Sequence, residues 1–87
     1  MFKNVPLDEG VKIVKQQEDK IGIYNVLFQF WVMEGVSAMS AIFLSSEVAD
    51  ISDSELQNLV KKECNTEETT ISRGEDYTFV NYGFNVF

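Results

Sequence analysis

The sequence predicts an α+β fold: one small antiparallel sheet of four to five strands with one or two helices packed on one face, in the approximate order α-β-β-α-β-β. Residues 22–33 and 77–87 alternate with the period of two that is typical of strands. Residues 51–64 carry the start signal and the apolar stripe of a helix. A chain of 87 residues can bury one hydrophobic core and not two, so we expect a single domain over 1–87.

The first element, residues 6–20, has the features of a helix. Pro6 suits a first helical turn, acidic residues come early, lysines come late, and a glycine follows. Gly10 opposes this interpretation, and Val11 with Ile13 can equally belong to a short strand that turns through residues 17–19 into the next segment. We expect the helix, with the strand as the alternative.

Residues 22–33 give the strongest strand pattern in the chain. One face carries β-branched and aromatic side chains throughout, so we expect it to be buried. The opposite face mixes polar and large apolar groups, which a solvated surface rarely presents, so we expect something to cover part of it. Gly35 then favours a tight hairpin that returns through 36–46. The residues of the first face are Tyr24, Val26, Phe28, Phe30 and Val32.

Residues 51–64 carry the clearest local signal. Ser52 and Glu55 have the spacing of a capping box, and Ile51 with Leu56 has the spacing of a hydrophobic staple. Apolar residues then recur on one side, and lysines near the end suit the helix dipole. We therefore expect an amphipathic helix that lies on the sheet.

The remainder of the chain predicts a second hairpin. Residues 65–68 are polar and predict a loop, and residues 69–72 predict a short strand. A turn follows over 73–76, after which 77–87 form a long strand whose two faces are both partly aromatic.

The residue types argue against catalysis. The chain has no histidine, which removes the commonest general base, metal ligand and activator of a nucleophile. Its five glycines do not recur at the spacing of a phosphate-binding loop. Adjacent carboxylates such as Glu67 and Glu68 point apart, and the acidic run 50–55 lacks the glycine and distal glutamate of a calcium loop. We expect no enzyme activity, catalytic residue, metal site or cofactor.

Charge and composition limit the partners. The net charge of −7, from 14 acidic and 7 basic residues, disfavours nucleic acid and anionic membranes. No Lys or Arg occurs between Ile21 and Val60, where five acids fall, so a charged partner is expected to be basic. The chain has no apolar run long enough for a membrane helix and no signal-peptide pattern at its start. Its single cysteine, Cys64, is expected to act as a small hydrophobe, and we expect a cytoplasmic protein.

The aromatic content indicates a binding role. Seven Phe, three Tyr and one Trp exceed what a core of this size needs, so the surplus implies a cover such as a partner chain or a second copy. We expect a non-catalytic protein-interaction module, an acidic accessory or inhibitor-type protein of the kind that bacteria and phages carry. It would act as a homodimer or on a basic partner surface. The expected interface residues are Trp31, Tyr77, Tyr82, Glu34, Glu75 and Asp76.

The alternative is a small apolar-ligand binding domain with an aromatic pocket enclosed by the sheet and a helix. Small residues such as Ala38 and Ala41 would leave space for the ligand. No motif is specific enough to identify a family. The expected ligand-binding residues are Phe28, Phe30, Phe43 and Tyr82.

Overall fold

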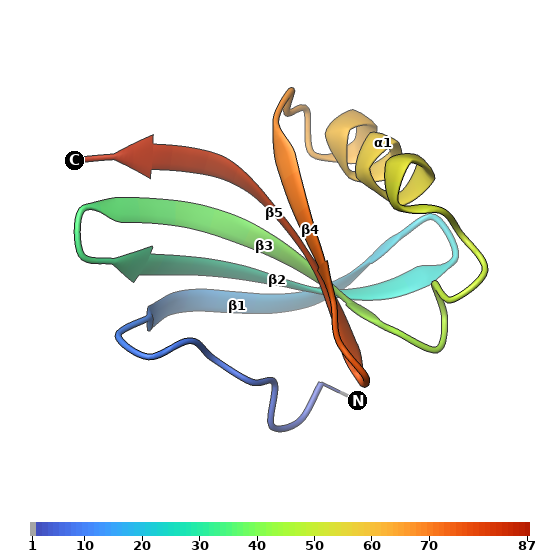
Figure 1. The fold of residues 1–87 in the computed structure, drawn as a ribbon, viewed down its shortest axis with the longest axis horizontal. Coiled ribbons are helices and arrows are strands. Elements are labelled where there is room, and N and C mark those ends of the chain that lie inside the picture. Colours follow the sequence, from blue (N-terminus) through green and yellow to red (C-terminus); the bar gives the residue numbers. More distant parts are fainter. Residues whose placement is uncertain (1) are drawn as a thin grey trace.

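The computed structural model describes residues 2–87 as one five-stranded antiparallel sheet with a single helix (Figure 1). The order of strands across the sheet is β1-β2-β3-β5-β4. The predicted α+β class and antiparallel sheet are confirmed. In chain order the elements are β1 (Lys12–Ile21), β2 (Tyr24–Met33), β3 (Val36–Leu44), α1 (Asp53–Glu63), β4 (Thr69–Arg73) and β5 (Tyr77–Val86).

The prediction of a helix over residues 6–20 is wrong. An irregular N-terminal segment, residues 2–11, leads into β1, which pairs antiparallel with β2. Gly10 has a φ of 83°, a left-handed conformation that interrupts a helix and that glycine adopts without strain. Pairing with β1 also provides hydrogen-bond partners for the backbone groups along the edge of β2. The free energy of these hydrogen bonds outweighs the weak helical preference of residues 12–20. The strand alternative is therefore correct in type, but β1 continues through residues 17–19, where a turn was expected, and turns at 22–23 instead. The element order is β-β-β-α-β-β.

The two predicted hairpins are confirmed within a few residues. The β2–β3 turn centres on Glu34 and Gly35, and Gly35 takes a φ of 78°. Beyond the turn, β3 ends at Leu44, two residues before the predicted limit. The short strand β4 and the long strand β5 form the second hairpin.

The helix signal is also confirmed. Ser52 is the N-cap of α1, and its side-chain oxygen accepts a hydrogen bond from the backbone nitrogen of Glu55 at 3.2 Å. Leu56 and Val60 are fully buried. They pack against Val26 and Phe43, and the core thus lies between α1 and one end of the sheet.

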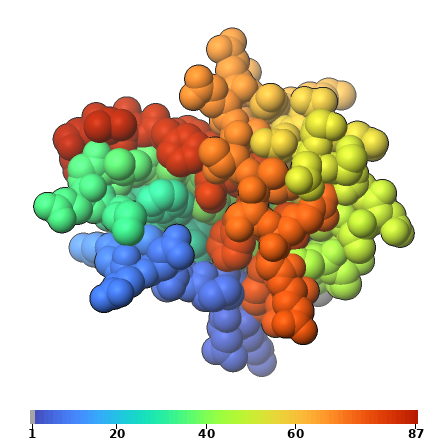
Figure 2. All heavy atoms as spheres, viewed as in Figure 1, coloured from blue at the N-terminus to red at the C-terminus, as the bar shows by residue number. Residues whose placement is uncertain are grey.

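The two sides of the sheet have different covers. We call the side that packs against α1 the helix side, and the other the N-segment side, because residues 2–11 lie over it. The hydroxyl of Tyr77 on that side donates to the carbonyl of Lys3 at 2.6 Å, and the rings of Phe2 and Tyr77 stack at 6.1 Å. In Figure 2 the blue N-terminal residues accordingly lie beside the orange β4–β5 hairpin. The chain itself supplies the cover that the mixed face of β2 indicated.

The face of β2 that was expected to be buried is buried only in part. Of its five side chains, only Val26 is fully buried, and the other four are half-buried. On the opposite face Leu27 and Gln29 are only 5% and 2% exposed. The elements that pack over each face explain the difference. Helix α1 covers one end of the face that carries Val26, whereas the N-terminal segment lies over part of the face that carries Gln29.

Candidate functional site

The helix side divides into a covered half and an open half. Figure 1 places α1 near the β1–β2 turn, whereas the β2–β3 turn and the end of β5 lie at the far end of the sheet. In the covered half the sheet residues that meet α1 are withdrawn from solvent. Toward the far end the apolar side chains on the same strands are half-buried. These residues, which we call the open half, are Phe28, Phe30, Val32, Met39 and Tyr82. Phe28 and Tyr82 form its boundary with the covered half, because they also pack against the core.

Strand register makes the open half continuous. Phe30 of β2 lies directly opposite Met39 of β3, and Met39 lies opposite Tyr82 of β5. Side chains that are directly opposite in neighbouring strands contact one another. A shallow hollow of about 310 Å³ lies at the β1 edge of this row, where Lys15 and Phe28 join Phe30 in its lining.

The structure brings together three of the four residues expected to line a ligand pocket. Phe28, Phe30 and Tyr82 lie in the open half, around Met39. Phe43 lies in the covered half and is fully buried among residues of the core. No enclosed aromatic pocket therefore contains all four, and the role of the three in binding stays a prediction.

The six residues expected at an interface are spread over the molecule. Tyr82 lies on the helix side, whereas Trp31 and Tyr77 lie on the N-segment side. Glu34 is exposed in the β2–β3 turn, and the pair Glu75–Asp76 is exposed in the β4–β5 turn at the opposite end of the sheet. Alternation within one strand carries no information about which face or end of the sheet residues of different strands share.

Acidic residues gather at the end of the molecule that α1 covers. The β3–α1 loop and the first turn of α1 supply four of them. The β4–β5 turn adds two more, and it is joined to the loop by a hydrogen bond from the Ser45 nitrogen to the Asp76 carbonyl at 3.0 Å. The six residues, which we call the acidic end, are Glu47, Asp50, Asp53, Glu55, Glu75 and Asp76.

Arg73, the only arginine of the chain, holds the acidic end in place. Its Nε donates to Asp53 Oδ1 at 2.6 Å. Its two terminal nitrogens donate to the carbonyls of Val48 at 2.9 Å and Ile51 at 2.6 Å. Glu47 adds a second link by accepting two hydrogen bonds from Asn25, at 3.0 and 2.9 Å. These contacts fix the loop that leads into α1 to the sheet.

Cys64 and Tyr82 form a half-buried pair at the boundary between the covered and the open half. Burial raises the pKa of the Cys64 thiol above its ordinary value of 9.0, although a hydrogen bond to Tyr82 opposes this shift. Burial and the same hydrogen bond raise the pKa of Tyr82 above its ordinary value of 10.0. Both groups are therefore protonated at neutral pH, and the thiol lacks the charge of a reactive cysteine.

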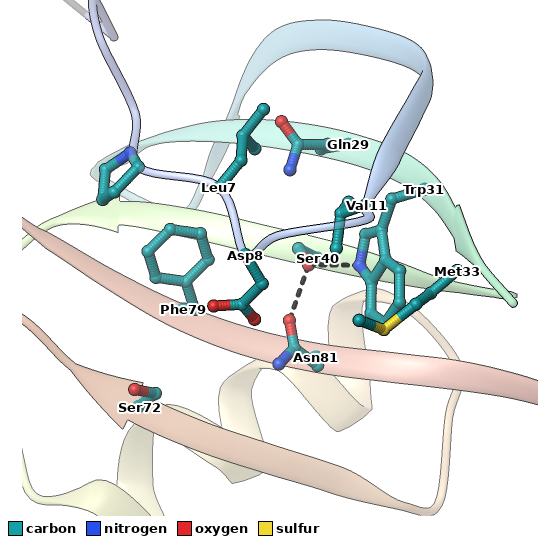
Figure 3. Close-up of a pocket in the computed structure, with 11 residues that line it drawn as sticks. Leu7, Asp8, Val11, Gln29, Trp31, Met33, Ser40, Ser72, Phe79 and Asn81 are labelled. Atoms are coloured by element: carbon teal, nitrogen blue, oxygen red, sulfur yellow. Dashed lines mark hydrogen bonds between the residues drawn. The ribbon is translucent and has the colours of Figure 1, made fainter. Parts of the chain in front are cut away.

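A second hollow, of about 240 Å³, lies on the N-segment side (Figure 3). The N-terminal segment forms its cover through Leu7, Asp8 and Val11, and strand residues that include Gln29 and Trp31 form its floor. Sequence reasoning did not identify this site. The available signal was the presence of polar residues in the middle of strands whose neighbours are apolar, at Gln29, Ser40 and Asn81.

Hydrogen bonds link the polar groups of this floor across the sheet. Trp31 Nε1 donates to Ser40 Oγ at 2.8 Å, and Ser40 Oγ donates to Asn81 Oδ1 at 2.5 Å. Gln16 Nε2 donates to Gln29 Oε1 at 2.7 Å. Such links allow polar side chains to be buried at the centre of a sheet without losing hydrogen bonds.

Other classes of site are not apparent in residues 2–87. Within that range no three Cys, Asp or Glu side chains are grouped in a way that can hold a metal ion. The helix α1, at 11 residues, falls short of the length that a membrane crossing requires. No family model, curated protein or solved structure matches the chain.

Proposed function

We propose that the protein is a non-catalytic interaction module that forms a homodimer by packing the open halves of two copies against each other. The observation that carries this proposal is the half-buried row Phe30, Met39 and Tyr82, which lies on the same strands as a fully buried core. Burial of apolar surface is the main favourable term in protein association. An apolar patch on a sheet face can pair with its own copy about a two-fold axis.

The charge distribution favours a second copy as the occupant. At a net charge of −7, two identical chains repel each other unless their acids are kept apart. The acidic end lies beyond the covered half, whereas the hollow in the open half is lined by Lys15 and has no acidic residue in its lining. Two copies that meet through their open halves therefore hold their acidic ends away from the contact.

Within residues 2–87 the outer edge of β5 is free beyond Tyr82, where Phe84 lines a hollow together with Lys61, Glu67 and Glu68. Pairing between β4 and β5 ends at Tyr82, while pairing between β3 and β5 continues to Val86. Beyond Tyr82, β5 thus has no strand on its outer side among residues 2–87. Phe84 in this part is 43% exposed. A free strand edge next to exposed apolar side chains is a common point of contact between chains.

Mass in solution tests the proposal. The wild-type chain is expected to have the mass of a dimer by sedimentation equilibrium at low and at high salt, because the contact is apolar. Phe30→Ser is expected to give a monomer. Ile23→Ser, which changes an exposed apolar residue in the β1–β2 turn, is the matched control and keeps the dimer.

A wild-type chain that stays monomeric at every concentration contradicts the homodimer. An increase in thermal midpoint when apolar dyes are added to that monomer would then support the alternative, a small apolar molecule in the hollow of the open half. Absence of both effects would remove the open half as a binding surface.

We further propose that the module acts without catalysis or cofactors, in the cytoplasm, and binds neither nucleic acid nor membranes. The absence of histidine, the acidic net charge and the single protonated cysteine support this part of the proposal.

A further inference from the structure

The hollow on the N-segment side is lined by a buried side chain, Gln29, that has one polar atom without a hydrogen-bond partner among residues 2–87. Gln29 is only 2% exposed, and its Oε1 accepts from Gln16. Its Nε2 donates to no other residue of 2–87. Every side-chain nitrogen or oxygen that is fully withdrawn from solvent in this range has a partner, so Nε2 keeps contact with solvent, and Gln29 lines the hollow. Figure 3 shows this amide nitrogen directed into the space beneath the N-terminal segment.

The opposite wall carries a carboxylate. Asp8 belongs to the N-terminal segment, lines the hollow, and pairs with no cation among residues 2–87. In Figure 3 its carboxylate is directed toward the sheet. The hollow therefore presents N–H donors from its floor and a negatively charged acceptor from its cover.

Aromatic side chains set the shape of the space between these two groups. Trp31 and Phe79 lie in the floor, and Leu7 and Val11 close the hollow from the N-terminal segment. Aromatic walls favour flat molecules. At about 240 Å³ the hollow has the liquid volume of roughly eight water molecules, which suits a molecule of one or two rings.

We propose that this hollow, the Gln29 pocket, binds a small planar nitrogen heterocycle that has a carbonyl acceptor and an N–H donor. The carbonyl oxygen accepts a hydrogen bond from Gln29 Nε2. The N–H group donates to the Asp8 carboxylate, and the ring packs against Trp31. Because Nε2 has no partner among residues 2–87, a ligand carbonyl can accept from it without breaking a hydrogen bond of the protein, and the same group then selects the ligand.

Trp31 is the only tryptophan of the chain, so its fluorescence reports on the pocket directly. Uracil and hypoxanthine are the probes, because they are flat and carry a carbonyl and an N–H on opposite edges of the molecule. We expect a saturable change in Trp31 fluorescence at millimolar concentrations, and a shift of the Gln29 side-chain amide signal in the NMR spectrum of the wild-type chain. Benzoate, a flat anion without a donor, and toluene, which has no polar group, are expected to give neither.

Two variants test the assigned contacts. Gln29→Met removes the donors at nearly constant volume, and Asp8→Asn removes the charge from an exposed side chain. Each is expected to weaken uracil binding by roughly three- to tenfold, the loss of about one hydrogen bond. The matched controls, Gln17→Met on the helix side and Glu9→Gln next to Asp8, keep the wild-type affinity.

The proposal is overturned if neither heterocycle changes the Trp31 fluorescence or the Gln29 amide signal, or if toluene or benzoate binds as well as uracil. It is also overturned if Asp8→Asn and Gln29→Met both bind like the wild type. Mapping the signals of the wild-type chain needs no variant, so the test stands even if Gln29→Met does not fold. Because the pocket and the open half are on different sides of the sheet, Phe30→Ser keeps uracil binding whether or not it dimerises.

Discussion

The covered and open halves of the helix side are built from the same strands and differ in what lies over them. Val26 and Phe30 share a face of β2, yet Val26 is fully buried whereas Phe30 is half-buried. On β3, Phe43 and Met39 show the same contrast. Apolar residues therefore alternate without interruption from the covered half into the open half, although the exposure of their side chains changes between the two halves.

The size of the helix explains where this boundary falls. A helix of 11 residues is about 16 Å long, whereas a strand of 10 residues spans about 33 Å. One such helix cannot cover the whole side of a sheet made of strands this long. Alternation along a strand therefore marks an apolar face, and the element that packs over this face decides which part of it becomes core.

The largest effect is expected from removing an aromatic ring in the covered half. Phe43→Ala leaves a cavity beneath α1 and should lower the free energy of unfolding by about 4 kcal/mol. Phe30→Ala in the open half should lower it by only about 1 kcal/mol, because solvent already reaches this side chain. Urea denaturation at a protein concentration low enough to avoid association measures both. Equal losses would mean that the two halves are equally packed.

A smaller effect is expected from the contacts that hold α1 over the covered half. Arg73→Met removes the three hydrogen bonds to Asp53, Val48 and Ile51 and should cost about 2 kcal/mol. Amide hydrogen exchange should accelerate in the β3–α1 loop and the first turn of α1. Lys62→Met, on an exposed position of the same helix, is the control. Unchanged exchange in the loop would show that Arg73 does not determine where the cover sits.

The N-cap of α1 contributes less. Ser52→Ala removes the acceptor of the Glu55 N–H and should lower the free energy of unfolding by about 1 kcal/mol. Ser46→Ala, an exposed serine of the preceding loop, should have almost no effect. If the two substitutions prove equivalent in thermal denaturation, the cap has no role in placing the helix.

The smallest effect is a dependence on alkaline pH at the edge of the open half. In the folded chain the pKa values of Cys64 and Tyr82 are raised, so the folded state keeps protons that the unfolded state loses. The stability from this pair is present below the ordinary values of 9.0 and 10.0 and is lost as the pH rises above them. The thermal midpoint should therefore fall between about pH 9 and pH 11, and less steeply in Tyr82→Phe. If the thermal midpoint falls equally steeply with pH in the wild type and in Tyr82→Phe, the role of Tyr82 is contradicted.

Local patterns predicted most of the fold because they depend on neighbouring residues alone. The cap at Ser52 and the turn at Gly35 are decided within a few positions of the chain. Residues 6–20 were predicted wrongly because their helical features are weak, and pairing with β2 competes with them. Of the candidate sites, the aromatic residues of the open half were identified in part, whereas the Gln29 pocket was not. That pocket requires residues 6–11 to lie over strands that follow them in the sequence.

By itself the sequence determined an acidic chain without histidine, the positions of four strands and one capped helix, and the apolar faces those strands would carry. Only the tertiary structure decided which half of the helix side α1 covers, at which end the acids gather, and that the N-terminal segment closes a pocket over Gln29. The physical reason is that alternation, caps and turns are local, whereas cover depends on the lengths and packing of elements that are distant in the chain.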